Sequence, residues 1–368
     1  MKTDDTTGNT AGKTAEAETG GAAGKRAAAR QQHGPARTAT SRRRVLTAAA
    51  ALAPALAVAG PTPAAHALPG RPAGPTPHPG PGHHERVAPA PTVLADWAGV
   101  ARALGRPGNM LRDTIYHTGF PRRDLHVVSE GVLVTAGLAL GTHVAFVRYA
   151  DGSTMVMGDV VVAEDELQQV TDAWLAHGIQ QTALHKHLLA QTPDIWWTHV
   201  HAHGYDPVAM ARGLRAGFDR TGTPPARPSL PPAPVDLDTD RMEAVLGAKG
   251  SVEDGLYKVL FVRRETIADG HLILPSGLGS TSAFNFQPLG GGRAALSGDC
   301  AMLAAEVPGV LKALRRGGIK LVELHNHHLD EDPRLFFTHF WAVGDGVALA
   351  RTARSALDAT DVVPGTLG

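Results

Sequence analysis

Histidine is concentrated in two short segments of the sequence that repeat each other. The first segment holds His185, His187 and His199, and the second holds His325, His327 and His339. Corresponding histidines are 140 positions apart (325 − 185, 327 − 187 and 339 − 199), so the segments align without a gap. Imidazole is the commonest metal ligand near neutral pH, and histidines without thiolates suit Zn or another divalent transition metal. The pattern H-x-H-x₁₁-H therefore predicts metal binding in both segments.

The spacing predicts how these side chains are presented. Side chains alternate between the two faces of a strand, so the two histidines of each H-x-H share a face. A turn centred on Pro193, or on Pro333, would let a returning strand add the third imidazole at a cross-strand distance of about 5 Å. The expected pairs are His187 with His199, His185 with His201, His327 with His339 and His325 with Trp341.

Several neighbouring residues have two interpretations. His201 could enlarge the first metal site or simply be exposed. Asp159 and Asp299 stand at equivalent positions (299 − 159 = 140) and could orient a ligand histidine. Hydrogen bonds at a strand edge are the expected role for these two carboxylates. Trp197 and Phe337 share the face of the histidines and could wall a pocket, although adjacent aromatic residues more often pack in a core.

Two further features recur or stand alone. The segments Arg122-Arg123-Asp124 and Arg263-Arg264-Glu265 repeat at an offset of 141 (263 − 122), and solvated ion pairs are their expected role rather than an anion site. Cys300 is the single cysteine, so no intrachain disulfide can form. It aligns with Val160, an apolar position, which favours a buried and inert thiol.

The elements that position the histidines can be read from periodicity. Apolar spacing predicts helices over 94–104, 164–177, 206–219 and about 345–358. Strand-like runs cover 131–136, 142–148, 154–162, 271–275 and 280–286. Asp206 with Pro207 is a typical helix start, and Gly178 is a typical helix end.

These elements predict an α+β fold built from two pseudo-repeats. Each repeat combines antiparallel strands with helices that cover one face, which suggests ferredoxin-like character. The expected repeats are 92–220 and 236–368, joined by a Pro-rich linker over 221–235. Whether the repeats share one sheet or one site is left open by the sequence.

The first 91 residues of the sequence are not expected to belong to the fold. Residues 1–67 predict an export signal with a long disordered leading region, because Arg42-Arg43-Arg44 precedes a short apolar run and Ala65-His66-Ala67. The paired arginines favour the twin-arginine route. Residues 68–91 are rich in Pro, Gly and His and predict a linker. We therefore expect an exported protein of the cell envelope or the extracellular space, with no membrane span and no lipid anchor.

The charge of the remaining chain restricts its partners. Residues 1–67 hold nine of the 35 basic and four of the 35 acidic residues, which leaves 26 basic and 31 acidic residues beyond them. Because this part is acidic, nucleic acid is an unexpected partner, whereas a small molecule or an envelope component is compatible with it.

The sequence resembles a known family. Met157-Gly158-Asp159, His177-Gly178-Ile179 and the string from Pro333 to Trp341 look like the LppY/LpqO family, and the likeness covers nearly all of 93–358. That family is a domain of unknown function with two repeats, often exported. The resemblance therefore implies the repeats and supplies no reaction. Lys186, where the family usually has Asn, and the missing lipid-bearing Cys are departures from its pattern.

Three functional classes follow from the sequence. The leading hypothesis is an exported protein that binds a transition metal and sequesters or senses it. An alternative is a hydrolase that uses a metal-bound water or paired histidines as acid and base. The third is a non-catalytic envelope module, in which the histidines only stabilise their strands.

Overall fold

The computed structural model describes residues 85–227 and 234–365. The predicted export signal, most of the first linker and the middle of the second linker lie outside the described residues. Where the first linker is described, it lies against other parts of the chain. Val87 forms a bridge with Leu272, and Pro89 forms one with Tyr149.

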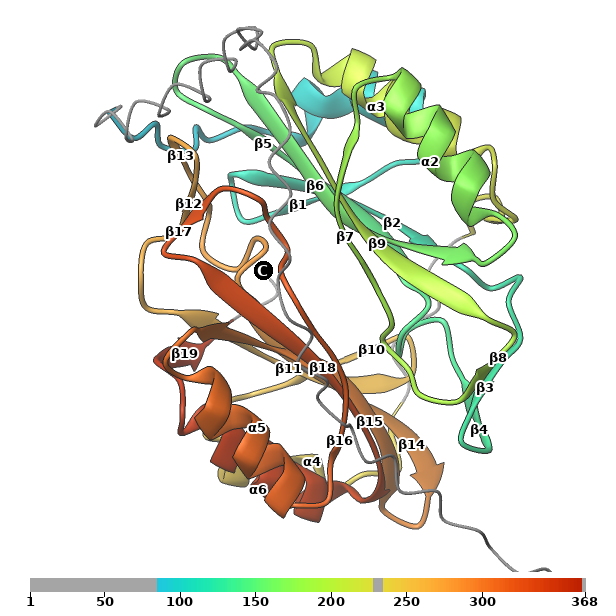
Figure 1. Cartoon of the computed structure of the whole chain (residues 1–368), viewed down its shortest axis with the longest axis vertical. Coiled ribbons are helices and arrows are strands. Elements are labelled where there is room, and N and C mark those ends of the chain that lie inside the picture. Colours follow the sequence, from blue (N-terminus) through green and yellow to red (C-terminus); the bar gives the residue numbers. More distant parts are fainter. Residues whose placement is uncertain (1–84, 228–233, 366–368) are drawn as a thin grey trace, which may run out of the picture. The chain divides into compact units, whose positions relative to one another are not determined.

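The first repeat forms an antiparallel sheet with helices beside it (Figure 1). Its elements are η1 (Leu94–Trp97), α1 (Ala98–Leu104), β1 (Asn109–Leu111), β2 (Ile115–Pro121), β3 (Val127–Ser129), β4 (Val132–Val134), β5 (Gly141–Arg148), β6 (Thr154–Ala163), α2 (Leu167–Ala176), β7 (Gln180–His185), β8 (Gln191–Thr192), β9 (Ile195–Gly204) and α3 (Pro207–Phe218). The six-stranded sheet has the order β1-β2-β5-β6-β9-β7, and β4-β3-β8 form a small separate sheet.

The second repeat has the same order of elements, except that within the described residues it lacks a counterpart of η1 and ends with an additional strand, β19. Its elements are α4 (Thr239–Leu246), β10 (Ser251–Glu253), β11 (Leu256–Arg263), β12 (Ala268–Asp269), β13 (Leu272–Ile273), β14 (Thr281–Gly290), β15 (Arg293–Leu303), α5 (Val307–Arg316), β16 (Lys320–His325), β17 (Glu331–Asp332), β18 (Leu335–Asp345), α6 (Gly346–Leu357) and β19 (Val362–Pro364). The large sheet has the order β10-β11-β14-β15-β18-β16, with β19 paired to β11. The small sheet is β13-β12-β17.

The predicted α+β class with two repeats is therefore confirmed, and the described residues contain six α-helices. The finer expectation of ferredoxin-like character stays a prediction. Helix ends follow the local chemistry of the sequence. Asp206 accepts hydrogen bonds from the first amides of α3, and Asp345 does the same for α6. Gly178 and Gly318 follow α2 and α5 with φ of 70° and 81°, a conformation that favours glycine.

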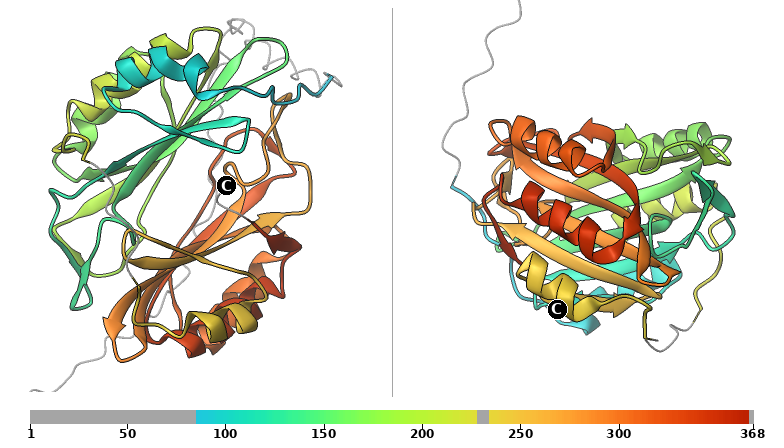
Figure 2. Two further views of the ribbon diagram at one scale, coloured as in Figure 1. Left: turned by 180° about the vertical axis from the view of Figure 1, so that it is seen from behind. Right: turned by 90° about the horizontal axis from the view of Figure 1, so that it is seen from below.

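Each large sheet buries one face under its own helices. In the first repeat Trp174 of α2 and Phe218 of α3 pack on Val144 and Val156 of the sheet. A corresponding core fills the second repeat. Figure 1 and both views of Figure 2 place the helices on the outer sides of the two sheets.

The other faces of the two sheets pack against each other. Two apolar clusters draw residues from both repeats: one joins Met157 to Phe337, and the other joins Trp197 to Trp341. The order of layers is thus helices, sheet, sheet, helices. Side chains on the inner faces of the sheets are consequently removed from water, and the two histidine segments lie there.

Candidate functional site

The histidine strands are paired in a different register from the one predicted. His185 lies opposite Trp197 rather than opposite His201, and His325 lies opposite Phe337 rather than opposite Trp341. A shift of register in β7, between Gln181 and Ala183, contributes to the difference.

The prediction of a tight hairpin between the two histidine strands is also wrong. β7 ends at His185, and the chain then leaves the sheet, so that β8 pairs with β3 before β9 begins. His187 therefore sits in a connecting segment beyond the end of its strand. The displacement is an even number of residues, so the histidines still share the inner face of the sheet, as the alternation predicted.

The histidines of the two repeats meet in one place. We call His185, His187, His199, His325, His327 and His339 the histidine cluster. His185 stacks on His325 with ring centroids 4.0 Å apart. Across the repeats, the centroids of His187 and His339 are 3.7 Å apart, and those of His199 and His327 are 4.0 Å apart. The question left open by the sequence is answered: the repeats bring their histidines together.

Two groups of three histidines in the cluster could hold a metal ion. They are His185 with His187 and His339, and His185 with His199 and His325. Within each group the candidate ligand atoms lie within 4.8 Å of one another. Two nitrogens bound to one zinc ion lie about 3.3 Å apart, given Zn–N bonds of about 2.0–2.1 Å, so small ring rotations complete either set. Each group contains residues of both repeats.

The cluster contains buried ring nitrogens without hydrogen-bond partners. These are Nδ1 of His185, Nε2 of His199, both ring nitrogens of His325, Nε2 of His327 and Nε2 of His339. A buried polar atom that lacks a partner costs about 1–3 kcal/mol, so native proteins leave few of them. A cation that accepts these lone pairs would remove the penalty, which is the fit expected of a metal site.

Burial keeps the imidazoles neutral. His185 is 2 % exposed and His339 is 4 % exposed. Burial lowers the pKa of His339 to about 4, and burial together with the neighbouring rings lowers the pKa of His185, His187, His199, His325 and His327. Neutral imidazole is the form that donates a lone pair to a metal. The cluster is therefore in its ligating form at neutral pH.

Each repeat also places one carboxylate beside the cluster. Oδ2 of Asp159 lies 3.3 Å from Nε2 of His187, and Oδ2 of Asp299 lies 3.3 Å from Nε2 of His327. Both Oδ1 atoms are buried and have no hydrogen-bond partner. Burial raises the pKa of Asp159 to about 8, and burial with the nearby Asp159 raises that of Asp299.

The expected strand-edge role of these carboxylates is wrong. β6 and β15 are interior strands of their sheets, and the carboxylates face the histidines. They offer oxygen ligands, or hydrogen-bond acceptors that fix ring orientation.

Aromatic walls and backbone carbonyls orient the rings. Trp197 stacks on His187 with centroids 4.5 Å apart, and Phe337 stacks on His327 at 3.4 Å. Nδ1 of His339 lies 3.0 Å from the carbonyl oxygen of Gly298, which leaves Nε2 directed away from the strand. The prediction that Trp197 and Phe337 lie on the histidine face is confirmed.

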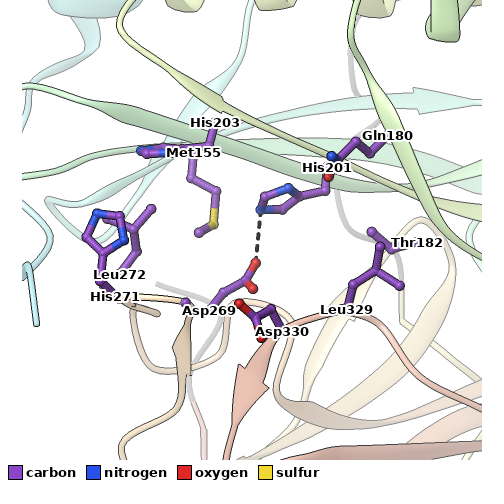
Figure 3. Close-up of a pocket in the computed structure, with 11 residues that line it drawn as sticks. Met155, Gln180, Thr182, His201, His203, Asp269, His271, Leu272, Leu329 and Asp330 are labelled. Carbon is purple, nitrogen blue, oxygen red and sulfur yellow. Dashed lines mark ion pairs between the residues drawn. The ribbon is translucent and has the colours of Figure 1, made fainter. Parts of the chain in front are cut away.

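A pocket is lined by residues of both repeats (Figure 3), and His201 in its wall is two residues from His199 of the cluster. Its volume is about 230 Å³, and its walls include His201 and His203 of β9 and Asp269 and His271 of the second repeat. Nε2 of His201 is 3.0 Å from Oδ2 of Asp269. His201, a possible addition to the first metal site, therefore faces this pocket and belongs to neither three-histidine group.

Sequence reasoning missed His328. Its side chain is fully buried, with Nδ1 at 3.4 Å from Oδ2 of Asp269 and Nε2 at 3.2 Å from the carbonyl oxygen of Gly279. The internal repeat gave no signal for it, because its counterpart is Leu188.

A family model matches the chain in two places. It is described as Domain of Unknown Function (DUF1259), and it matches residues 98–220 and again residues 240–359. The chain belongs to this family. Each match spans one sheet with its helices, so each structural repeat is one DUF1259 region. Each region supplies three histidines and one aspartate to the composite site.

Solved structures add no functional argument to the DUF1259 assignment. The fused permuted hexameric shell protein MSM0275 from the RMM microcompartment is 15 % identical, over 58 % of this chain and 86 % of that one, with a TM-score of 0.16. The trimeric bacterial microcompartment shell protein PduB is 13 % identical, over 70 % and 95 %, with a TM-score of 0.18. EtuB from Clostridium kluyveri is 11 % identical, over 68 % and 88 %, with a TM-score of 0.17. No curated protein matches the chain.

The repeated arginines of the DUF1259 regions are structural. Arg122 is 1 % exposed and bonds to both Asp124 and Glu166, and it also donates to the carbonyl oxygen of Val161. Arg263 makes the equivalent contacts with Glu265 and Glu306. The expectation of solvated ion pairs is therefore wrong for these two residues. Each guanidinium ties the end of a sheet strand to the start of a helix.

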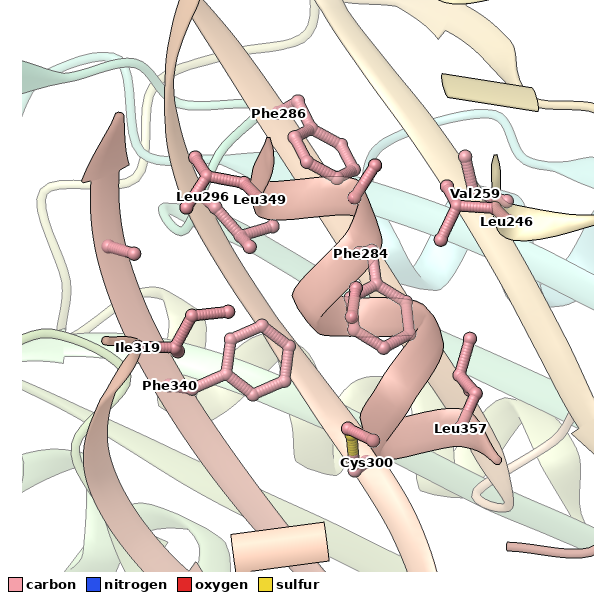
Figure 4. Close-up of a cluster of buried hydrophobic side chains, with 14 of the residues drawn as sticks. Leu246, Val259, Phe284, Phe286, Leu296, Cys300, Ile319, Phe340, Leu349 and Leu357 are labelled. Carbon is pink, nitrogen blue, oxygen red and sulfur yellow. The ribbon is translucent and has the colours of Figure 1, made fainter. Parts of the chain in front are cut away.

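Cys300 lies in the apolar core of the second DUF1259 region (Figure 4). Burial raises its pKa well above the usual value, so the thiol stays protonated. The prediction that Cys300 is buried is confirmed, and its lack of reactivity stays a prediction. Among the described residues, no helix has the length and apolar character needed to cross a membrane.

Proposed function

We propose that the protein binds a transition-metal ion in the histidine cluster. The observation that carries this proposal is the convergence of histidines from both repeats in one place, where several buried ring nitrogens have no hydrogen-bond partner. Ordinary packed histidines would be expected to satisfy those nitrogens with backbone or side-chain groups, as His328 does.

The donor set restricts the metal. Imidazoles with adjacent carboxylates and no thiolate suit Zn, Cu, Ni or Fe, whereas Ca and Mg prefer oxygen ligands throughout. When bound, such an ion would supply Lewis acidity and would hold the two repeats together. His185 occurs in both three-histidine groups, so we assign it as the ligand common to either arrangement.

Sequestration in the cell envelope is the role that we propose for this site. Deep burial slows the loss of an ion, which suits storage or transfer more than rapid turnover. The twin-arginine signal over residues 1–67 and the LppY/LpqO likeness support an exported location. The twin-arginine route carries folded proteins, so an ion could be loaded before export.

Metal analysis of the mature protein without a polyhistidine tag tests the proposal. We expect at least one equivalent of a transition metal per chain by mass spectrometry, and little in the double variant His185→Ala with His325→Ala. His177→Ala is the matched control, because His177 is exposed and hydrogen-bonds to the backbone of its own helix. A wild-type protein that binds no Zn, Cu, Ni or Fe at any concentration tested would overturn the proposal.

Hydrolysis is a second candidate, and the contact between Asp159 and His187 favours it. A carboxyl group 3.3 Å from a ring nitrogen of His187 is within reach to exchange a proton with it or with a bound water. The test is an activity screen of the metal-loaded protein over ester and phosphodiester substrates, with Asp159→Asn as the comparison. If Asp159→Asn retains full activity, the acid-base role is excluded. The envelope-module alternative predicts that histidine variants lose stability and nothing else.

A further inference from the structure

The histidine cluster is buried at its centre and partly exposed at its margin. His185 is 2 % exposed, whereas the side chains of His187 and His327 are 13 % and 12 % exposed. An ion therefore needs a path from solvent to the central rings. Ligating side chains between the cluster and solvent would provide such a path.

The antiparallel strands β6 and β9 carry such side chains in two adjacent rows, one on each strand. Their cross-strand pairs are Asp159 with His199, Met157 with His201 and Met155 with His203. Paired residues share a face, and alternate residues on a strand are about 6.6 Å apart. Each step of the row therefore offers an imidazole beside a thioether or a carboxylate. We call these six residues the ligand rows.

Exposure increases along the β9 row: His199 is buried in the histidine cluster, His201 is partly buried and His203 is exposed. Met157 and Met155 of the β6 row are both buried beside them. The histidines of β9 thus run from the cluster to the surface of the protein, and the two thioethers line their inner side.

The outer end of the ligand rows opens into the pocket that both repeats line (Figure 3). The ring centroids of His203 and His271 are 5.9 Å apart. Two imidazoles bound to one ion have centroids about 5 Å apart when the metal-nitrogen bonds are about 2.0–2.1 Å, so these rings are close to a shared ligating position. Further in, His201 meets Asp269 at 3.0 Å. Imidazole, thioether and carboxylate donors are therefore gathered on both sides of the pocket.

The second repeat has no equivalent route. Its pairs at the same positions are Asp299 with His339, Ser297 with Trp341 and Ala295 with Val343. Trp341 is fully buried where the first repeat has His201. The donors are thus retained at the cluster and lost outside it, although the backbone pairing is the same. Packing of the fold does not require the exposed His203, whereas Met155 is 1 % exposed and also belongs to an apolar cluster between the two sheets.

We propose that the pocket formed by Met155, His201, His203, Asp269 and His271 captures a transition-metal cation from solvent and passes it along the ligand rows to the histidine cluster. This inference rests on the proposed function, because it needs the cluster to be the final site. It adds a separate capture site and a direction of transfer through the first repeat.

The rate of metal uptake tests the route. Apoprotein is mixed with Co(II), and the visible absorption of the bound ion is followed by stopped flow, with equilibrium stoichiometry measured on the same samples. His203→Val and Met155→Ala install the residues found in the second repeat. We expect uptake slower by about tenfold, the low end of the cost of losing a supporting residue at a metal site. Final stoichiometry is expected to be unchanged, because the cluster is intact.

His126→Ala is the matched control. It removes an exposed imidazole of the first repeat that lies outside the pocket and the cluster, and it should load at the wild-type rate. His203→Val changes an exposed residue, so it tests the route without disturbing the core.

The outcomes separate the two proposals. If His203→Val and Met155→Ala both take up metal at the wild-type rate, the proposed route is wrong and the proposed metal site in the cluster is unaffected. A wild-type protein that takes up no metal overturns both. Slow loading in the two variants but not in His126→Ala supports capture at the pocket.

Discussion

His185 of the first repeat stacks on His325 of the second repeat, with ring centroids 4.0 Å apart and ring planes 16° from parallel. On either side of this pair, each remaining histidine has its nearest imidazole in the other repeat: His187 meets His339, and His199 meets His327. Each candidate ligand set is therefore crosswise, that is, it combines histidines of both repeats, and within residues 85–227 and 234–365 no set comes from a single repeat.

Crosswise ligation predicts strong coupling between repeats. His187→Ala and His339→Ala each remove one ligand of the same three-histidine group, so the loss of metal affinity in the double variant should be far from additive. Coupling of about 0.5–3 kcal/mol is typical of residues that share a partner. Titration calorimetry of the wild type, both single variants and the double variant measures it. Additive losses would show that the two residues do not share an ion.

Removing an unpaired imidazole should stabilise the metal-free protein. Both ring nitrogens of His325 lack hydrogen-bond partners, and such atoms cost about 1–3 kcal/mol each. His325→Leu should therefore unfold at equal or higher urea concentration than the wild type when both are free of metal, and should lose the stabilisation that added metal gives.

His328→Leu is the control for this experiment. The ring nitrogens of His328 have partners in Asp269 and Gly279, so its replacement should lower stability. If His325→Leu is as destabilising as His328→Leu without metal, the unpaired nitrogens of His325 do not carry the expected penalty.

The buried arginine of the first repeat should be essential to stability. Arg122→Met leaves Glu166 and Asp124 without their cation, and breaking a buried pair costs about 3–5 kcal/mol. Arg123→Met is the matched control, since Arg123 is 41 % exposed and its ion pair to Asp254 is long at 3.9 Å. It should change stability by less than about 1 kcal/mol. Denaturant unfolding compares them, and equal midpoints would contradict the role assigned to Arg122.

Acid should weaken the corresponding network in the second repeat. The hydrogen bonds from Arg263 hold the pKa of Glu265 below its usual value of 4.5. A carboxyl whose pKa is lowered by folding stabilises the native state above its unfolded pKa, and loses that contribution as pH falls through the folded value. Melting temperatures of the wild type and Glu265→Gln should therefore differ at neutral pH and converge below about pH 4. A constant difference across this range would exclude Glu265 as the titrating group.

Much of the fold could be predicted from sequence because its signals are local. The Asp206 cap and the glycine after α2 each act within a few residues, and the repeat offset of 140 is read directly from the sequence. The face of the histidines was also predictable, since alternation depends only on parity. The register was not, because it depends on a shift inside β7 and on β8 pairing with β3 rather than with β9.

The kinds of residue in the site were easier to predict than which residues from distant segments meet there. Asp269 and His271 lie far in sequence from His201 and His203, and only the packing of the two sheets brings them together. The burial of Arg122 depends likewise on Glu166, which is 44 residues away. Repetition identified the residues that both halves retain, and it gave no signal for those, such as His328, that only one half has.

Joining the two repeats in one polypeptide has a consequence for how the molecule can vary. In a symmetric pair of identical subunits, every substitution occurs twice, so Met155 and His203 on one side would require the same residues on the other. Here the second repeat has Ala295 and Val343 at those positions, opposite a shared centre that keeps its near two-fold arrangement. Covalent linkage thus allows residues outside the histidine cluster to differ between the two repeats, while each repeat keeps the same three histidines in the cluster.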